Sequence, residues 1–277
     1  MATRRLSRCP IPVRPTGNVD IPKGPAAQIP VYVNNFNRLS STKALVEWLL
    51  KSGTQKVVIL DNASTYSPLL EYYNALPAGV SVVRQENLGP WSFWKTGKHT
   101  TQTLPYVVTD ADLVPSDCCP LDLIEKMQDL LLSVAGCEKV GPGLRLDNIP
   151  DLSRDFITNG DGKGWEGEGV YWKKRHESGA FIAPIDTTFA IYKPFAPWTE
   201  ADWTGSVKNL RMDIPYVVEH TPWYVQELTE EEKYYRDHVD NAWSHISWDS
   251  PLNSKLKKDS ECSIHIYGSG KMELHTT

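Results

Sequence analysis

The chain has 277 residues, of which 40% are hydrophobic and 23% are charged, and its formal net charge is −5 at pH 7. This length and composition predict a globular protein with a sizeable core. No stretch reaches the roughly 18 consecutive apolar residues that a membrane-spanning helix needs. The acidic balance, without an extended basic block, argues against nucleic acid as a partner but allows a small nucleotide ligand.

The first 28 residues are expected to form a flexible arm. They contain four arginines and five prolines, and none of their stretches resembles a secretory signal. A transit peptide is the disfavoured alternative, because Asp20 and the prolines interrupt an amphipathic helix. The five cysteines are scattered and odd in number, with Cys118 next to Cys119, so they form neither a disulfide framework nor a zinc motif. We therefore predict a cytoplasmic protein in a reducing compartment.

From residue 29 onward, short apolar runs alternate with segments of helical periodicity. Strands are expected at 29–33, 57–60, 80–83 and 106–109. One helix is expected to begin at Ser40 or Ser41, and another at Ser67 with Pro68 in its first turn. This alternation predicts parallel strands joined by crossover helices. The expected fold class is therefore α/β, with a Rossmann-like, mostly parallel central sheet flanked by helices.

Residues 116–250 are expected to add a mixed α+β half to the same domain. Apolar residues at helical spacing predict a helix between Leu121 and Val134. Thr229, with Glu232 three residues later, forms a capping box before another helix. Further strands are expected at 140–146, 189–192 and 216–218. We thus predict one domain over residues 29–250, divided near residue 115, with a polar tail at 251–277.

The acidic pair Asp110 and Asp112 directly follows the fourth expected strand. Alternate residues of an extended segment face the same way, so both carboxylates could bind one divalent cation. Two fixed carboxylates with no positive charge between them are costly. A solvated acidic turn is the alternative, because aspartate is common where strands end.

Polar residues also follow the other three strands of the first half. Ligands of open α/β sheets bind at the carboxyl ends of the strands, although each such residue could equally start a turn. The residues concerned are Asn34, Asn35, Arg38, Asp61, Asn62, Asn87 and Gly89. Neither a G-x-G-x-x-G motif nor a P-loop accompanies them.

The order of the motifs at 30–34, 58–64, 87–89 and 109–112 resembles the nucleotide-sugar-binding half of GT-A fold glycosyltransferases. The similarity covers roughly residues 29–225, and the second half looks like a family-2-like bacterial and viral branch. The resemblance implies a nucleoside contact at Asp61 and a Mn²⁺ or Mg²⁺ ion held by Asp110 and Asp112, the DxD motif of that family. It also implies that the polar strand ends bind the donor nucleotide.

Four residues of the second half are candidates for further roles. His220 could be a metal ligand beside the carboxylates or a packed core residue. Arg211 could neutralise donor phosphate or form an ordinary ion pair. Asp186 is favoured over Glu166 as the catalytic base, and for each a structural or solvated role is the alternative.

The leading hypothesis is a metal-dependent glycosyltransferase that moves a sugar from a nucleoside-diphosphate sugar to a hydroxyl acceptor, expected to be a glycan, with inversion. One alternative is a nucleotidyltransferase on a similar sheet, although the glycine-rich, Arg- or Lys-containing loop expected after its first strand is missing. The other is a non-catalytic carbohydrate-binding module that uses some of the ten tryptophans, because flat rings stack on sugars.

Overall fold

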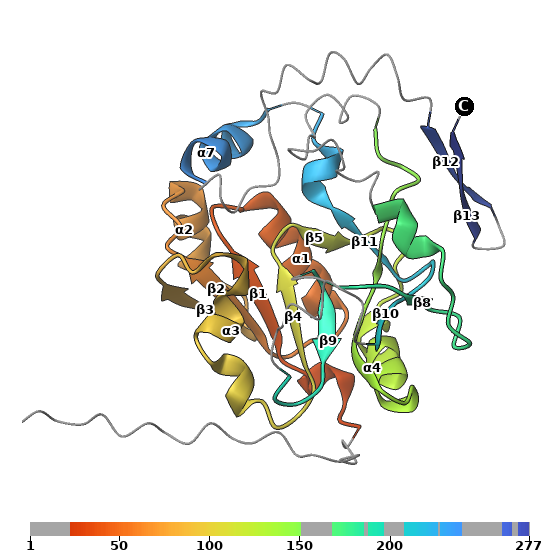
Figure 1. Cartoon of the computed structure of the whole chain (residues 1–277). Coiled ribbons are helices and arrows are strands. Elements are labelled where there is room, and N and C mark those ends of the chain that lie inside the picture. Colours follow the sequence, from red (N-terminus) through yellow and green to blue (C-terminus); the bar gives the residue numbers. More distant parts are fainter. Residues whose placement is uncertain are drawn as a thin grey trace, which may run out of the picture.

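The structure is a computed structural model that describes residues 23–150, 168–185, 188–196, 208–226, 228–239, 262–267 and 271–276. Within these ranges the centre of the molecule is an eight-stranded sheet with the order β3-β2-β1-β4-β9-β6-β10-β8 (Figure 1). Its strands are β1 (Val31–Asn35), β2 (Val57–Asn62), β3 (Val80–Gln85), β4 (Tyr106–Asp110), β6 (Cys137–Gly141), β8 (Phe181–Ile182), β9 (Ala190–Tyr192) and β10 (Lys208–Arg211).

Most strands of this sheet run in parallel. β1 pairs in parallel with β2 and β4, β2 with β3, and β6 with β10. β9 is antiparallel to both β4 and β6, so these two neighbours of β9 run in the same direction. Consequently the carboxyl ends of β3, β2, β1, β4, β6 and β10 lie at one edge of the sheet. The predicted α/β class with a mostly parallel central sheet is confirmed.

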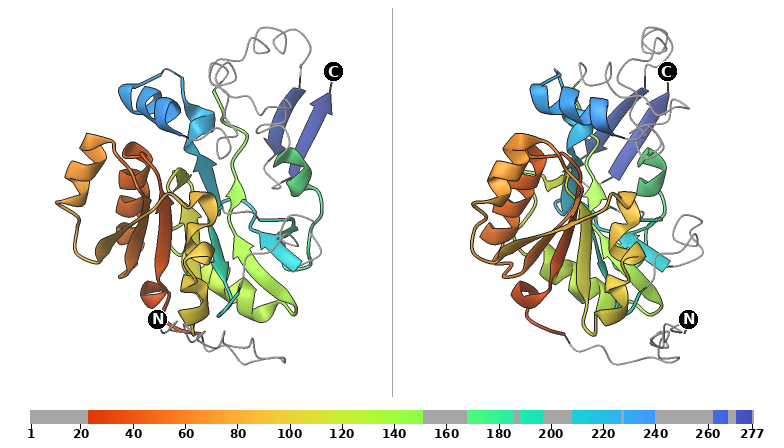
Figure 2. Two further views of the ribbon diagram at one scale, coloured as in Figure 1. Left: turned by 60° about the vertical axis from the view of Figure 1, so that its left-hand side comes forward. Right: turned by 90° about the vertical axis from the view of Figure 1, so that its left-hand side faces the viewer.

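Helices cover both faces of the sheet. They are α1 (Ser40–Lys51), α2 (Ser67–Tyr73), α3 (Ser92–Lys95) and α4 (Leu123–Ser133). Single turns of 3-10 helix are η1 (Ala26–Gln28), η2 (Gly89–Trp91), η3 (Lys98–Thr101), η5 (Gly169–Trp172) and η6 (Thr221–Tyr224). The buried residues of α1 and α4 share one core cluster, and those of α3 share another with the opposite side chains of β1 and β4. The right-hand view of Figure 2 shows α1 and α3 on opposite faces.

Helix α1 shows how the sequence builds one layer. Leu45, Val46 and Leu49 recur at helical spacing, and each is 0% exposed against the sheet. Burying one such side chain contributes about 1.5–3 kcal/mol. Gly53, two residues after the helix ends, adopts φ +88°, which favours glycine.

A smaller sheet and a further helix extend the carboxyl side of the molecule. β5 (Leu113–Pro115), β11 (Val217–His220) and β7 (Gly143–Leu144) form a three-stranded sheet with β11 in the middle. Helix α7 (Glu230–His238) lies above α2 in Figure 1. In the predicted polar tail, β12 (Cys262–Tyr267) and β13 (Lys271–Thr276) pair as an antiparallel hairpin. None of the helices in the described ranges is long and apolar enough to cross a membrane.

Candidate functional site

The carboxyl edge of the parallel strands gathers the polar residues that the sequence places after each strand. On the face that carries α3, a chain of hydrogen bonds crosses four strand ends. Gln85 Nε2 donates to Asn62 Oδ1 (3.1 Å), Asn62 Nδ2 to Asn34 Oδ1 (2.6 Å), and Asn34 Nδ2 to Asp110 Oδ1 (3.2 Å). Ser92 Oγ, at the start of α3, also donates to Asn34 Oδ1 (2.6 Å). Asn34, Asn62 and Asp110 are therefore brought together at this edge.

On the opposite face, Asp61 is the centre of a second network. Its carboxylate is 0% exposed. Tyr73 donates its hydroxyl to Oδ1 (3.1 Å), while Arg84 Nε (3.3 Å) and the backbone N–H of Ser64 (3.2 Å) donate to Oδ2. These contacts position Arg84, whose side chain is 54% exposed, at the rim of the edge. The nucleoside contact implied for Asp61 stays a prediction.

The loop after β1 is fixed by its own side chains and by the loop after β2. Asn35, 1% exposed, accepts from the Arg38 backbone N–H and donates to the Arg38 carbonyl, closing a turn. Asn37 lies in the left-handed region at φ +52°, and its Oδ1 accepts from the backbone N–H groups of Thr65 and Tyr66. Asn35 thus has the turn role that the sequence left open as its alternative.

Arg38 is a buried cation between β1 and helix α7. It is 4% exposed, its Nη1 lies 2.6 Å from Glu232 Oε2, and its guanidinium carbon lies 3.6 Å from the centre of the Tyr235 ring. Burial acts to lower the pKa of Arg38, but the interactions with Glu232, Tyr235 and Asp112 together outweigh it and raise the pKa, so the group stays charged. Asp112 is among the acidic groups that act on it.

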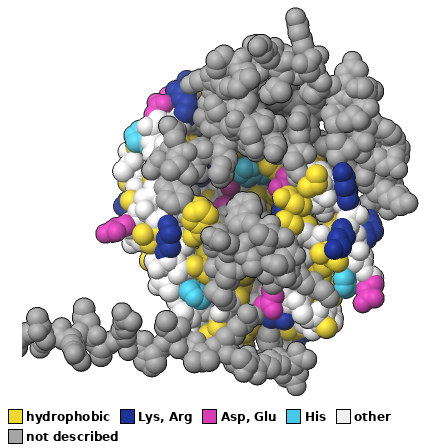
Figure 3. Space-filling view, in the orientation of Figure 1, with side chains coloured by type: hydrophobic (Ala, Val, Ile, Leu, Met, Phe, Trp, Pro, Cys, Tyr) yellow, Lys and Arg dark blue, Asp and Glu magenta, His cyan; other side chains and the backbone are white. Residues whose placement is uncertain are grey.

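His220 lies beside the acidic pair. Its Nε2 is 3.5 Å from Asp112 Oδ2, and both side chains are partly exposed. The contact arises because β11 pairs antiparallel with β5, which places His220 opposite Leu113, next to Asp112. Burial of Asp112 acts to raise its pKa, but the charge and hydrogen bond of His220 and the charge of Arg38 outweigh it, so that the pKa lies below its usual value. Figure 3, in the orientation of Figure 1, shows histidine and acidic side chains near the middle of the surface that faces the viewer.

One geometric expectation for the acidic pair is wrong. β4 ends at Asp110, and Ala111 and Asp112 form the turn into β5 instead of continuing an extended strand. Ala111 is 3% exposed and packs in the core, which anchors this turn. The side chains of the pair consequently have different partners, Asn34 for Asp110 and His220 for Asp112.

Asn87 and Arg211 each have local partners. Asn87 Oδ1 accepts from the backbone N–H of Gly89 (3.0 Å) in the turn after β3. Arg211, 5% exposed at the end of β10, pairs with Glu168 (2.6 Å) and donates to the carbonyl of Pro184. Asp186 and Glu166, the two candidates for a catalytic base, lie outside the described residues.

Sequence reasoning missed several residues of this edge. Tyr73 and Arg84 hold Asp61, whereas Glu231 and Glu232 reach the loop after β1 from the far end of the chain. The place of Arg84 at this edge could have been predicted from the sequence. In an extended strand its side chain lies on the same face as those of Val80 and Val82, at the strand's carboxyl end. The contacts of Glu231 and Glu232 could not have been predicted from local sequence, since they join residues 191 or more positions apart in the chain.

The tryptophans give no support to the carbohydrate-binding alternative. Trp94, Trp172 and Trp223 are 7–8% exposed, and Trp48 and Trp91 pack against the same two core clusters. These are the tryptophans of the described ranges; three are buried in the core and two are partly buried against it.

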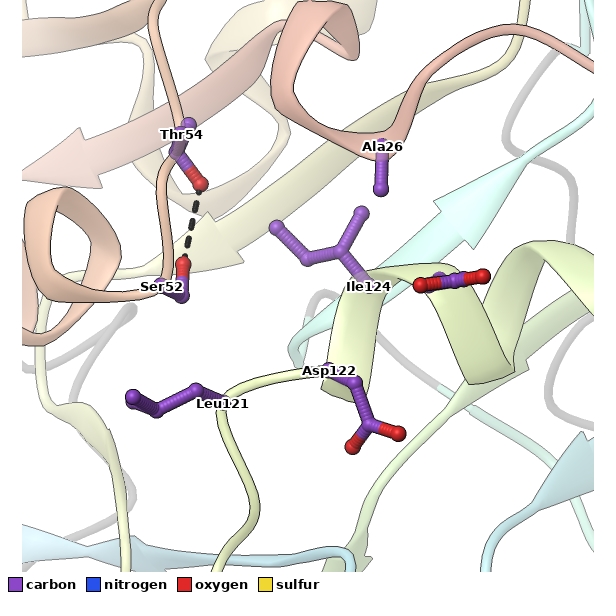
Figure 4. Close-up of a pocket in the computed structure, with 7 residues that line it drawn as sticks. Ala26, Ser52, Thr54, Leu121, Asp122 and Ile124 are labelled. Atoms are coloured by element: carbon purple, nitrogen blue, oxygen red, sulfur yellow. Dashed lines mark hydrogen bonds between the residues drawn. The ribbon is translucent and has the colours of Figure 1, made fainter.

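A cavity of about 290 Å³ lies at the other end of the sheet (Figure 4). It is lined by Ala26, Ser52, Thr54, Leu121, Asp122, Ile124 and Glu125. Ser52 and Thr54 precede β2 and Ala26 precedes β1, so this cavity is separate from the carboxyl edge. Within the ranges that the structure describes, no group of three or more His, Cys, Asp or Glu side chains is arranged to hold a metal ion.

Comparison with known proteins returned similar solved structures only. No family model and no curated protein matches the chain. HddC from Yersinia pseudotuberculosis matches with a TM-score of 0.39 and 12% identity over 60% of this chain and 77% of its own. Its complex with GMP-PN matches with a TM-score of 0.36 and 14% identity over 60% and 74%. The 4-diphosphocytidyl-2C-methyl-D-erythritol synthase from Anaerococcus prevotii matches with a TM-score of 0.39 and 7% identity over 76% and 97%.

These findings correct the expected family. The similar structures named above are HddC and a synthase of a diphosphocytidyl compound, and none of them is a GT-A glycosyltransferase. The assignment to that family, its glycosyl transfer from a nucleoside-diphosphate sugar and its glycan acceptor are therefore wrong. The physical reason lies in the motifs, because short polar sequences after parallel strands occur wherever an α/β sheet binds a ligand at its carboxyl edge.

Proposed function

We propose that the chain is an enzyme that binds a nucleotide at the carboxyl edge of the sheet and transfers its nucleotidyl group to a phosphate-bearing acceptor. The contact between Asp112 and His220 carries this proposal. It brings a carboxylate and an imidazole together at the edge, 3.5 Å apart, close to the buried cation Arg38. A ligand with both phosphate charge and an associated divalent cation matches this mixture of groups.

The residues present fit a divalent cation that the nucleotide brings with it. Mg²⁺ is usually bound by one or two carboxylates together with substrate phosphates, and Mn²⁺ also accepts imidazole. Asp112 and His220 would hold the ion, with Asp110 close in sequence. When bound, such an ion neutralises the charge that develops on the phosphates. With only these protein ligands, metal binding should depend on the nucleotide.

Nucleotidyl transfer to an acceptor phosphate is a reaction in which none of the carboxylates described at this edge has to act as a general base. Attack by an acceptor phosphate, which is already ionised, depends mainly on positioning and on charge neutralisation. No general base is then required, and Asp61, Asp110 and Asp112 each have a structural partner. Arg84 is exposed at the rim and held by Asp61, so its guanidinium is positioned for the phosphates.

The test is a screen for pyrophosphate release. Each ribonucleoside triphosphate is incubated with a panel of phosphate monoesters and Mg²⁺ or Mn²⁺, and the products are followed by phosphorus NMR. We expect release with one nucleotide and acceptor pair, and a loss of about a hundredfold in Asp112→Asn. The matched control is Asp117→Asn, which removes the same charge from an exposed position nearby. Full turnover in Asp112→Asn, or binding of nucleotides without any release, would overturn the proposal.

A further inference from the structure

We propose that the end of β1 is a binding site for a diphosphate group, and that Glu231 and Glu232 of helix α7 occupy it as an internal substitute for that ligand. The site consists of the Arg38 guanidinium and the first N–H groups of α1. The inference rests on the proposed function only in naming a nucleotide as the natural source of the diphosphate. The contacts among Arg38, the start of α1, Glu231 and Glu232 define the anion site and its internal occupant.

Arg38 provides the first part of the site. It is 4% exposed, and within the described part of the chain its Nε and Nη2 are buried without a hydrogen-bond partner. Glu232 Oε2 lies 2.6 Å from Nη1 but is not aligned for a hydrogen bond with it, so this is a close ion pair of poor geometry. A planar guanidinium with two unused N–H edges is suited to bidentate binding of a phosphate.

The N-terminus of α1 provides the second part. Helix α1 has 12 residues, no acidic residue in its first turn and no side-chain cap of its own. Glu231 supplies the missing acceptors, since its carboxylate accepts from the backbone N–H groups of Leu39 (2.8 Å) and Ser40 (3.1 Å) and from Ser40 Oγ (2.6 Å). Such helix ends favour anions through their free N–H groups and the helix dipole. An external anion would satisfy the same donors.

The two parts are contiguous, and so are the two occupants. Residues 38–40 present the guanidinium and the helix end side by side, and consecutive glutamates of α7 fill both. A pair of neighbouring negative groups is also what a diphosphate offers. The charges of Asp112 and Arg38 act on each other, so this anion site is electrostatically coupled to the Asp112 and His220 contact.

Helix α7 is held in place mainly by polar and aromatic contacts, which makes exchange with a ligand feasible. None of its residues is fully buried. Tyr234 donates to Thr65 Oγ1 (3.0 Å) and its ring lies 5.0 Å from that of Tyr66, while the Tyr235 ring lies 6.3 Å from that of Phe36. Elements with few buried apolar contacts open at low free-energy cost.

The test is calorimetric titration of the full chain with inorganic pyrophosphate, without metal. Because the internal carboxylates compete with the ligand, we expect the double variant Glu231→Gln, Glu232→Gln to bind pyrophosphate about tenfold more tightly than the wild type. The control is Glu230→Gln, which removes one carboxylate charge from the same helix at a side chain that is 86% exposed. It should bind within about twofold of the wild type. Equal or weaker binding by the double variant would overturn the proposal.

Two further measurements guard against a folding artefact. The single variant Glu232→Gln keeps Glu231 as the cap of α1. Adding Arg38→Met to it removes the cation that Glu232→Gln leaves unpaired, and should abolish any gain in pyrophosphate affinity over the wild type. In the wild type, saturating pyrophosphate should increase hydrogen exchange of the α7 amides and leave those of α4 unchanged. Binding with unchanged α7 exchange would also refute the internal substitute. Neither result depends on nucleotidyl transfer, so a failed pyrophosphate-release screen leaves this inference testable by itself.

Discussion

The hydroxyl of Tyr73 should contribute measurably to stability, because it hydrogen-bonds a carboxylate that water does not reach. It donates to Asp61 Oδ1 (3.1 Å) and accepts from Asn35 Nδ2 (2.9 Å). Burial, followed by the negative charge of Asp61, raises the pKa of Tyr73, so the hydroxyl keeps its proton at all physiological pH values. Tyr73→Phe removes this donor and leaves the shape of the core unchanged.

The expected cost follows from the burial of Asp61. A hydrogen bond to a charged group contributes about 1.5–3 kcal/mol, and a buried group that loses its partner cannot replace it with water. Asp61 is 0% exposed. Asn35 keeps a second acceptor, the Arg38 carbonyl (3.0 Å), so its share of the loss is small. We therefore expect Tyr73→Phe to lower the free energy of unfolding by about 2–3 kcal/mol.

Urea denaturation followed by circular dichroism measures this loss. The matched control is Tyr72→Phe at the neighbouring, half-buried position, where no hydrogen bond of the hydroxyl is found within the described ranges. It should change the free energy of unfolding by less than about 0.5 kcal/mol. A Tyr73→Phe protein as stable as the control would show that the Asp61 network does not hold the edge together.

Two other predictions concern packing and thiol chemistry. A Cβ at Gly141 would lie 2.5 Å from the carbonyl oxygen of Phe189, so Gly141→Ala should cost about 1–3 kcal/mol in urea denaturation, whereas Gly24→Ala, which meets nothing within 4 Å, should be neutral. Burial raises the pKa of Cys119 to about 12, so iodoacetamide at mildly alkaline pH should modify the exposed Cys118 and spare Cys119. Mass spectrometry of the protein labelled in its native state would measure the modification of each thiol. Equal labelling of Cys118 and Cys119 would contradict the prediction about thiol chemistry.

Much of the fold followed from local sequence. The apolar run at 57–60, which contains three β-branched residues, predicted a buried strand that the structure shows as β2, and its alternation with helices predicted the parallel pairing. Half of the expected capping box forms, because the Glu232 backbone N–H donates to Thr229 Oγ1 (3.2 Å). The Glu232 side chain, however, turns to Arg38 instead of back to Thr229, since an ion pair with a buried cation outweighs a solvated hydrogen bond.

Other features depended on contacts between distant parts of the chain. Ser40 or Ser41 was expected to cap α1, but Leu39 occupies the cap position and Glu231 supplies the acceptor from 192 residues away. The His220 contact with Asp112 likewise depends on the pairing of β11 with β5, which no local pattern specifies. The family was mistaken for a related reason, because polar strand ends indicate where a ligand binds without specifying the reaction.

The central claim, that Asp112 and His220 complete a metal site together with nucleotide phosphates, is tested most directly by electron paramagnetic resonance of Mn²⁺. The wild type and Asp112→Asn are each titrated with Mn²⁺ in the presence and absence of a nucleoside triphosphate. We expect the nucleotide to tighten Mn²⁺ binding to the wild type beyond its binding to free nucleotide, and Asp112→Asn to lose about 10–100-fold in that affinity. Equal Mn²⁺ binding by the two proteins, with and without nucleotide, would contradict the claim.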